Sequence, residues 1–237
     1  MQAPTLLPDL KDSKSRRQTM VDCQIRTFDV TDQLVLAQFE KVPREQFLPD
    51  AFRDLAYSDI GFTIPASAAG GEERYLLTPL VLARLLQGGR VAASDKVLDI
   101  AGGSGYSAAI LAGLASEVVA LEANAALRQD LESRVTAARL RNVRTLEGPL
   151  ERGAAGEGPF DVILVNGAVE TGLDALFAQL TEGGRLLTIS RFENDPTGRA
   201  AKAVLYEKTS GEVSGRVLFD ASAPVLAAFK RAPAFVF

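Results

Sequence analysis

Short apolar runs alternate with segments of helical periodicity along most of the chain. Five of these runs are bounded by turn formers and have the length of buried strands: residues 97–100, 118–121, 143–146, 162–165 and 185–190. The segments between them repeat apolar residues every three or four positions, which is the spacing of an amphipathic helix. Strands that alternate with helices predict a parallel sheet with right-handed crossovers, so the expected fold class is α/β.

Capping residues mark where several helices begin. Helices are expected after Asp32, Thr78 and Asn124, whose side chains can accept from the free N–H groups of a first turn, and Pro79 suits the first helical position. One more helix is expected after the fourth strand, with an apolar face formed by Leu173, Leu176, Phe177 and Leu180. The segment from Ile64 to Gly71 is rich in alanine and glycine and is expected to be a loop without regular structure.

The chain is expected to hold one domain and a short arm. Residues 1–18 contain two prolines and a polar cluster with little periodicity, which predicts a flexible N-terminal arm. A single domain then covers residues 19–237. Its parts are a helical, substrate-side region at 19–90, a cofactor-binding core at 91–192 and a C-terminal β-hairpin region at 193–237. The hairpin prediction rests on apolar runs at 203–206 and 217–219, which flank the turn formers Ser210-Gly211.

A glycine-dense turn follows the first of the five strands. The turn spans Gly102 to Gly105 and leads directly into a helical pattern that begins at Tyr106. Glycine lets the backbone adopt positive φ, and the free N–H groups of the helix N-terminus can face a ligand. Glu122 ends the next strand, and an acidic residue there usually binds a ribose diol. The turn and the acid together indicate a cofactor that contains adenosine.

The charge of Asp99 helps to choose between two such cofactors. The spacing Gly103-x-Gly105-x-x-Ala108 also fits a relaxed dinucleotide motif, so a nicotinamide-dependent oxidoreductase is an alternative. A carboxylate beneath the loop repels a pyrophosphate, whereas S-adenosylmethionine brings an ammonium and a sulfonium to the same place. Charge therefore favours the methyl donor.

Composition narrows the chemistry further. The 237 residues carry a net charge of -4 and no long basic run, so nucleic acid is not the expected partner. The single cysteine, Cys23, is expected in the core, and the chain has no histidine, so we expect no metal site. A carboxylate is already a nucleophile at neutral pH, so methylation of a carboxylate suits a site without histidine. The lack of a membrane-spanning or secretory apolar stretch predicts a cytoplasmic protein.

Two levels of resemblance add to this interpretation. The segment from Asp99 to Gly105 resembles the first motif of class I methyltransferases, with Ala101 where a first glycine is commoner. From Met20 to Phe192 the chain also resembles the protein-L-isoaspartate O-methyltransferase family. The matching segments are Gln24-Ile25-Arg26, Val42-Pro43-Arg44-x-x-Phe47-Leu48-Pro49, Val97 to Tyr106, Asn142-Val143, Pro159 to Val165 and Gln179-Leu180-x-x-Gly183-Gly184-Arg185-Leu186.

The resemblance implies a class I methyltransferase fold with a Rossmann-like, mostly parallel seven-stranded sheet, an antiparallel edge hairpin and an N-terminal helical elaboration. It also assigns residues. S-adenosyl-L-methionine would be bound by Asp99, Ala101, Gly102, Gly103, Ser104, Gly105, Glu122, Ala123, Gly148 and Asn166. The substrate would lie near Leu76, Leu77, Thr78 and Gly167, and Thr78 is the candidate catalytic residue.

The chain departs from the family pattern at two places. Leu77 occupies the position of a serine that lies in the family's active site, and Thr78 follows one place late, where it can simply cap a helix. The segment Glu147-Gly148-Pro149-Leu150 replaces a Gly-Asp-Gly near the adenine, and Pro149 has no backbone donor.

The function expected from the resemblance is methylation of a carboxylate in a damaged protein or peptide, with protein repair as its role. Two alternatives remain: a related methyltransferase with a different acceptor, and a cofactor-binding protein without isoaspartyl activity.

Overall fold

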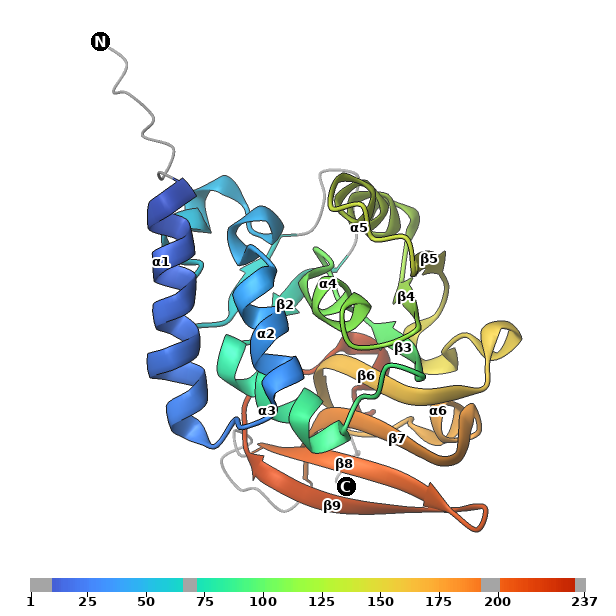
Figure 1. Ribbon diagram of the computed structural model, residues 1–237. Coiled ribbons are helices and arrows are strands. Elements are labelled where there is room, and N and C mark those ends of the chain that lie inside the picture. The colour runs from blue at the N-terminus through green and yellow to red at the C-terminus, as the bar shows by residue number, and fades with distance from the viewer. Residues whose placement is uncertain (1–9, 66–71, 193–200, 233–237) are drawn as a thin grey trace, which may run out of the picture.

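A twisted seven-stranded sheet forms the centre of the molecule in the computed structural model, which describes residues 10–65, 72–192 and 201–232 (Figure 1). Its strand order is β5-β4-β3-β6-β7-β8-β9. The strands are β3 (Lys96–Ile100), β4 (Glu117–Glu122), β5 (Val143–Glu147), β6 (Phe160–Val169), β7 (Leu180–Arg191), β8 (Ala201–Thr209) and β9 (Glu212–Asp220). The first five in this order run parallel, and β8 and β9 form an antiparallel hairpin at the edge, which confirms the predicted α/β class and topology.

Helices cover the sheet, and their predicted N-caps are present. The α-helices are α1 (Leu10–Met20), α2 (Gln33–Lys41), α3 (Pro79–Gly89), α4 (Tyr106–Ala112), α5 (Ala125–Ala137) and α6 (Asp174–Phe177). Asp32, Thr78 and Asn124 each accept a hydrogen bond from a backbone N–H in the first turn of α2, α3 and α5, respectively. The first turn of each of these three helices is therefore capped by a side chain, as the sequence predicts.

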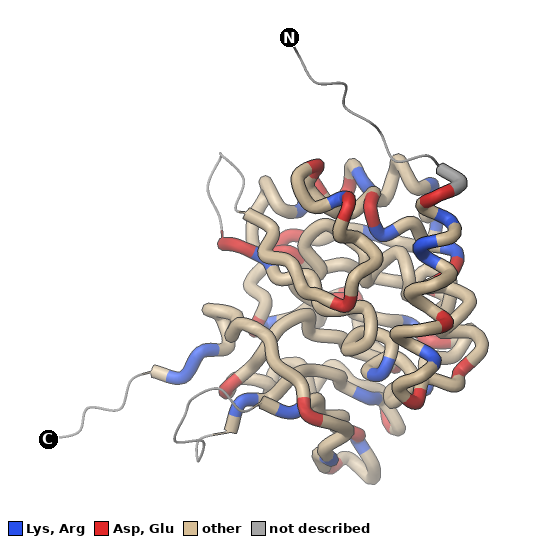
Figure 2. The backbone as a smooth tube through the Cα atoms, turned by 90° about the vertical axis from the view of Figure 1, so that its left-hand side faces the viewer, with Lys and Arg blue, Asp and Glu red and all other residues tan. Residues whose placement is uncertain are grey.

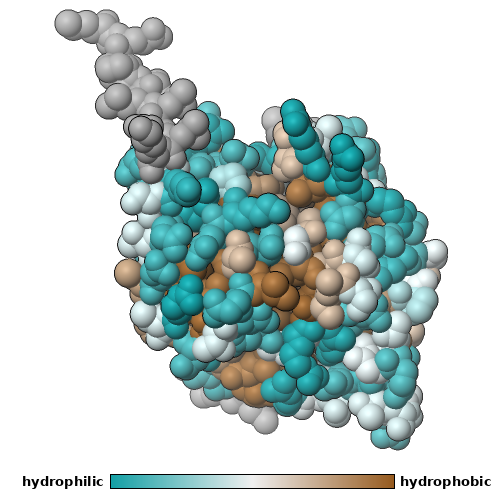
Figure 3. Space-filling view, viewed as in Figure 1, coloured by the Kyte–Doolittle hydropathy of each residue, from teal (hydrophilic) through white to brown (hydrophobic). Residues whose placement is uncertain are grey.

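Side chains on successive positions of a strand pack into two separate apolar cores. Val97 of β3 belongs to the core shared with α2, α3 and α4, whereas its neighbour Leu98 belongs to the core on the other face, with α6 and the C-terminal segment. This alternation is the period of two that a pleated strand imposes. Figure 3 shows apolar side chains near the middle of the face that carries α2 and α4, surrounded by hydrophilic groups.

The prediction of a flexible arm over residues 1–18 is wrong for residues 10–18, because these residues belong to helix α1. Residues 1–9 lie outside the described part of the chain. Polar contacts hold this helix: Arg17 Nε donates to the carbonyl of Glu40 at 2.6 Å and its Nη1 donates to Tyr57 Oη at 3.0 Å. Charges of both signs are interspersed on this side of the molecule (Figure 2). A search for apolar periodicity misses a helix that is held by polar side chains.

Three other expectations need correction. Strands β1 (Phe62–Ile64) and β2 (Arg74–Leu76), which were not expected, pair as a small antiparallel hairpin on either side of the expected loop. Of the predicted loop at 64–71, Ile64 belongs to β1, and residues 66–71 lie outside the described residues. The helix expected through Leu180 ends at Phe177, because Leu180 begins β7. Cys23 is exposed rather than part of the core.

Candidate functional site

The carboxyl ends of β3, β4 and β6 bring three polar side chains together beneath the glycine loop. Asp99 and Glu122 are completely buried and Asn166 is nearly so. The chain crosses to opposite sides of β3 to form β4 and β6, and ligands of open α/β sheets bind at such a topological switch point. The structure therefore places these three predicted cofactor residues in one location.

The glycine loop makes the sharp turn that the sequence predicts. Gly103 and Gly105 have φ of 59° and 87°, and Ala101 has φ of 58° although it carries a Cβ. The N–H of Gly103 donates to Glu122 Oε1 at 2.7 Å. The loop is thus tied directly to the acid at the end of β4.

Asp99 is held by neutral donors. Asn166 Nδ2 donates to one carboxylate oxygen at 2.7 Å, and Ser107 Oγ donates to the other at 2.8 Å. Burial raises the pKa of Asp99 to about 6, against these two hydrogen bonds, which lower it, and with a smaller upward effect of the charge on Glu122. An ammonium group placed beside Asp99 would stabilise its ionised form.

Glu122 already has a cationic partner. Arg74 Nε of β2 donates to Glu122 Oε2 at 2.9 Å, and the exposed fractions of the two side chains are 1% and 0%. The sequence did not predict this pair. Ala123 and Gly148 lie beside Glu122: the N–H of Ala123 lies 3.3 Å from Glu122 Oε2, and that of Gly148 donates to the Glu122 carbonyl.

A bulge in β6 positions Asn166 and Gly167. The register to β7 shifts between Leu164 and Ala168, so that the intervening residues leave the regular ladder. Asn166 Nδ2 reaches both Asp99 and the carbonyl of Ile100. Gly167 faces the C-terminal segment: a Cβ added there would lie 2.7 Å from Leu226 Cγ.

That C-terminal segment covers the end of β6. Val225 forms a parallel bridge with Ala168, and the carbonyl of Phe229 accepts from the N–H groups of Glu170 and Thr171. The sequence analysis missed this contact. Apolar residues at Val225, Leu226 and Phe229 were the available signal, but three residues do not reveal their partner strand.

The predicted substrate residues enter α3 from β2. Leu76 and Leu77 are buried among apolar side chains, and Thr78 Oγ1 accepts from the N–H of Val81 at 3.2 Å as an N-cap. The carbonyl of Leu77 accepts from Arg44 Nη2. Leu77 therefore presents no polar side-chain group, and the hydroxyl of Thr78 is engaged in capping.

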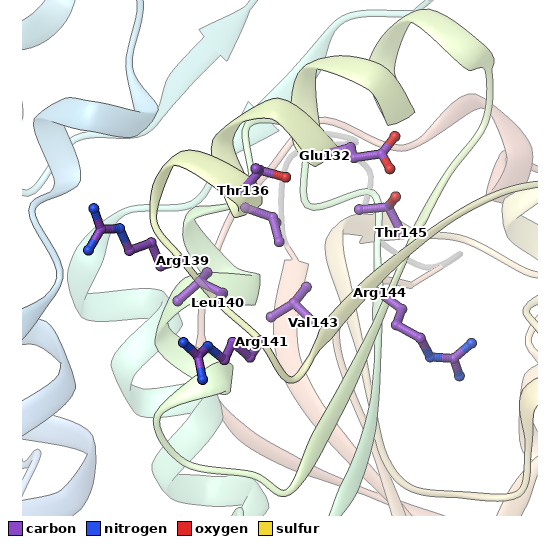
Figure 4. Close-up of a pocket in the computed structure, with 9 residues that line it drawn as sticks. Glu132, Thr136, Arg139, Leu140, Arg141, Val143, Arg144 and Thr145 are labelled. Atoms are coloured by element: carbon purple, nitrogen blue, oxygen red, sulfur yellow. The ribbon is translucent and has the colours of Figure 1, made fainter.

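Cavities help to locate ligand space. A cavity of about 300 Å³ lies between β2 and the C-terminal segment, lined by Thr63, Glu72, Glu73, Arg74, Tyr75, Pro224, Val225, Leu226 and Ala227. A larger one, about 570 Å³, lies between α5 and β5 (Figure 4). Arg139 and Arg141 point outward from it, and Val143 lies at the amino end of β5, so this cavity is at the wrong end of the sheet for the predicted site.

The polar groups beneath and within the glycine loop have the chemistry that an adenosine-containing cofactor requires. Asp99 offers a carboxylate for a cation, Glu122 one for hydroxyl groups, and Ser104 Oγ is buried without a partner among the described residues. Arg74 is paired with Glu122, the carboxylate that the ribose would use.

Within the described residues, no group of three His, Cys, Asp or Glu side chains is placed to hold a metal ion. No helix in this part of the chain combines the length and hydropathy needed to cross a bilayer.

Known proteins resemble this chain over most of its length. The family model for protein-L-isoaspartate(D-aspartate) O-methyltransferase matches residues 15–218. The protein-L-isoaspartate O-methyltransferase of Koribacter versatilis is 35% identical over 215 residues, covering 90% of this chain and 91% of the relative. Protein-L-isoaspartate O-methyltransferase 1 of Rhodopseudomonas palustris is 35% identical over 184 residues, covering 78% of this chain and 73% of the relative.

Solved structures agree on the fold. One protein-L-isoaspartate O-methyltransferase superimposes with a TM-score of 0.77 at 24% identity, covering 89% of this chain, which spans 66% of that protein's length. A Plasmodium falciparum protein solved with S-adenosyl-L-homocysteine gives a TM-score of 0.69 at 19% identity and covers 91% of this chain and 98% of its own. At these identities the likeness establishes the class I methyltransferase fold and nothing finer.

Proposed function

The chain belongs to the protein-L-isoaspartate O-methyltransferase family, whose members use S-adenosyl-L-methionine, and from this premise we propose that it methylates a carboxylate of a damaged protein or peptide. Protein repair in the cytoplasm is part of the proposal. The observation that carries it is the buried cluster of Asp99, Glu122 and Asn166 beneath the glycine loop.

Each residue of the cluster has a role that its chemistry supports. S-adenosyl-L-methionine supplies an activated methyl group. Asp99 would face its cationic end, Glu122 would accept from the ribose hydroxyls, and Asn166 would hold Asp99 in place through the 2.7 Å hydrogen bond. Because an acceptor carboxylate is ionised at neutral pH, the site needs to align and desolvate it rather than remove a proton.

The acceptor is the less supported half of the proposal. Leu77 is apolar and packed in the core, and the hydroxyl of the adjacent Thr78 caps α3. The cap uses one lone pair of this hydroxyl and leaves its O–H free to donate, but it holds the group at the start of α3, one position after Leu77. These observations favour a second candidate function: a methyltransferase of the same family with another acceptor.

A labelling experiment separates the two functions. The chain is incubated with S-adenosylmethionine labelled on its methyl group, together with an isoaspartyl peptide, the same peptide containing normal aspartate, or a cell extract. Carboxyl methylation predicts base-labile label in the isoaspartyl peptide alone. Label that appears only in other components of a cell extract would favour the second candidate, and the absence of any transfer would contradict both.

Matched variants connect the activity to the site. Asp99→Asn removes the buried charge and should weaken binding of S-adenosylhomocysteine, measured by calorimetry. Asp161→Asn is the control, because Asp161 lies at the amino ends of the strands, where it accepts from the N–H of Lys96 and from Thr181 Oγ1. Equal effects of the two substitutions would contradict the assignment of Asp99.

A further inference from the structure

Arg74 occupies the position from which a ribose would reach Glu122. Its Nε donates a hydrogen bond to Glu122 Oε2 at 2.9 Å, and the backbone N–H of Gly103 donates to Glu122 Oε1 at 2.7 Å. Both oxygens of this carboxylate are thus engaged within the protein. Arg74 and Glu122 are buried together, so the ion pair is shielded from water and salt.

The aliphatic part of Arg74 also lies against the glycine loop. A Cβ added to Gly103 would come within 2.9 Å of Arg74 Cβ. The surface of the loop that faces β2 is therefore covered by the same side chain that neutralises the acid. A nucleoside that bridges the loop and Glu122 cannot share this space with Arg74.

A second carboxylate offers Arg74 somewhere to go. Its Nη1 donates to Glu72 Oε2 at 3.2 Å, and the Glu72 side chain is 48% exposed. Its Nη2 is buried and has no partner among the described residues. The guanidinium thus lies between an inner acid, Glu122, and an outer acid, Glu72.

The element that carries Arg74 is not hydrogen-bonded into the seven-stranded sheet, although Phe62 and Leu76 of its hairpin pack in the core. Strand β2 is three residues long and pairs with β1 alone, with Arg74 opposite Ile64 in the register. The hairpin of β1 and β2 forms a separate two-stranded sheet. Its displacement would leave the seven-stranded sheet and all its ladders intact.

We propose that Arg74 competes with the cofactor for Glu122, so that the nucleoside binds only after the guanidinium has moved from Glu122 toward Glu72. This inference rests on the proposed function. The apparent dissociation constant then equals the intrinsic one divided by the fraction of molecules in which Glu122 is uncovered. Arg74 and Glu72 consequently set the cofactor affinity without helping to bind the cofactor.

Two substitutions should change that affinity in opposite directions. Arg74→Ala uncovers Glu122 permanently, so S-adenosylhomocysteine should bind about ten-fold tighter or more in calorimetry. Glu72→Gln removes the outer acid and should weaken binding, since the guanidinium then prefers Glu122. Arg90→Ala is the control, because it removes an exposed arginine paired with Glu207 and should leave the affinity unchanged. Equal or weaker binding by Arg74→Ala would overturn the proposal.

A measurement on the unmodified chain covers the case in which Arg74→Ala does not fold. Adding S-adenosylhomocysteine should speed hydrogen exchange of the amides in β1 and β2 while slowing exchange in the glycine loop. Unchanged or slower exchange in the hairpin would overturn the competition. If the wild type and Arg74→Ala bind equally, only the competition is wrong; if neither binds, the proposed function is wrong as well.

Discussion

Asp99 is a completely buried carboxyl group whose two partners are neutral, and this has a consequence for stability. Its pKa is raised from 3.8 to about 6 in the folded chain, mainly by burial. The folded state therefore binds a proton more tightly than the unfolded state between these two pH values. Its contribution to stability is greatest at low pH and is lost as the pH rises from about 4 to about 6.

The substitution Asp99→Asn should remove this loss, because an amide does not ionise. Its oxygen can accept from Asn166 Nδ2, and its NH2 can donate to Ser107 Oγ, which reverses that hydrogen bond. The free energy of unfolding of the variant, relative to the wild type, should increase between pH 4 and pH 6.5 by up to about 3 kcal/mol and then stay level. Urea denaturation across this range measures it. A difference that is constant with pH would mean that folding does not raise the pKa of Asp99.

Ala101 is strained where its family commonly has glycine. Its φ of 58° lies in the left-handed region, which disfavours a residue with a Cβ. Ala101→Gly should stabilise the chain by roughly 0.5 to 1 kcal/mol, because glycine relieves the strain. The control Ala108→Gly, inside helix α4, should destabilise by about 1 kcal/mol. Thermal unfolding distinguishes the two signs, and destabilisation by both substitutions would show that the Ala101 methyl matters more than its backbone.

The residues of the site differ in how far sequence alone could find them. Asp99 and Glu122 follow from local spacing, since Asp99 lies one residue before the end of an apolar strand that leads into the glycines, and Glu122 ends the next strand. Arg74 does not, because its partner lies 48 positions away and an arginine in a short polar stretch usually faces solvent. The place of Asp99 and Glu122 beside the glycine loop was thus predictable, and the arginine that covers Glu122 was not.

Arg44 fixes the arrangement of several short elements. Although completely buried, it donates to the carbonyls of Ala56, Ile60 and Leu77 at 3.0 to 3.1 Å and lies over the ring of Phe62. Its contacts assign it to the structure, as the tie between the turn at 56–60 and the start of α3.

Removing this tie should be costly. Arg44→Met leaves several buried carbonyls without donors, each of which costs about 1 kcal/mol or more, so the free energy of unfolding should fall by roughly 3 kcal/mol. Arg90→Met, at an exposed position, should change it by less than about 0.5 kcal/mol. Chemical denaturation of both variants checks this, and similar small effects would mean that water replaces the guanidinium.

The contact between Gly167 and Leu226 joins β6 to the C-terminal segment. Since a Cβ at position 167 would lie 2.7 Å from Leu226 Cγ, Gly167→Ala should destabilise the chain by roughly 1 to 3 kcal/mol through overpacking. Leu226→Ala alone should cost about 2 to 4 kcal/mol through the cavity it leaves. The double variant Gly167→Ala, Leu226→Ala should lose clearly less stability than the sum of the two single losses, because the smaller side chain at position 226 makes room for the added Cβ. A double-mutant cycle measures this difference. Additive losses would indicate that the C-terminal segment moves away from β6 when Gly167 is replaced.

For the molecule as a whole, the sheet was predictable and its surroundings were less so. Five strands with continuous apolar runs and three capped helices determine the parallel part, because burial on both faces leaves a strong sequence signal. Helix α1 and the hairpin of β1 and β2 escaped prediction for physical reasons. The helix docks through Arg17 and other polar groups, and each strand of the hairpin is only three residues long.

The contact between Phe229 and the end of β6 also sets a time order during synthesis. A ribosome adds about 5 to 20 residues per second, so roughly 60 residues separate the emergence of Glu170 from that of its partner by several seconds. The parallel strands can assemble in that interval, while Gly167 and Ala168 still lack their C-terminal neighbours. This end of β6 therefore closes later in synthesis than the parallel strands, and it stays exposed to chaperones and proteases longer than they do.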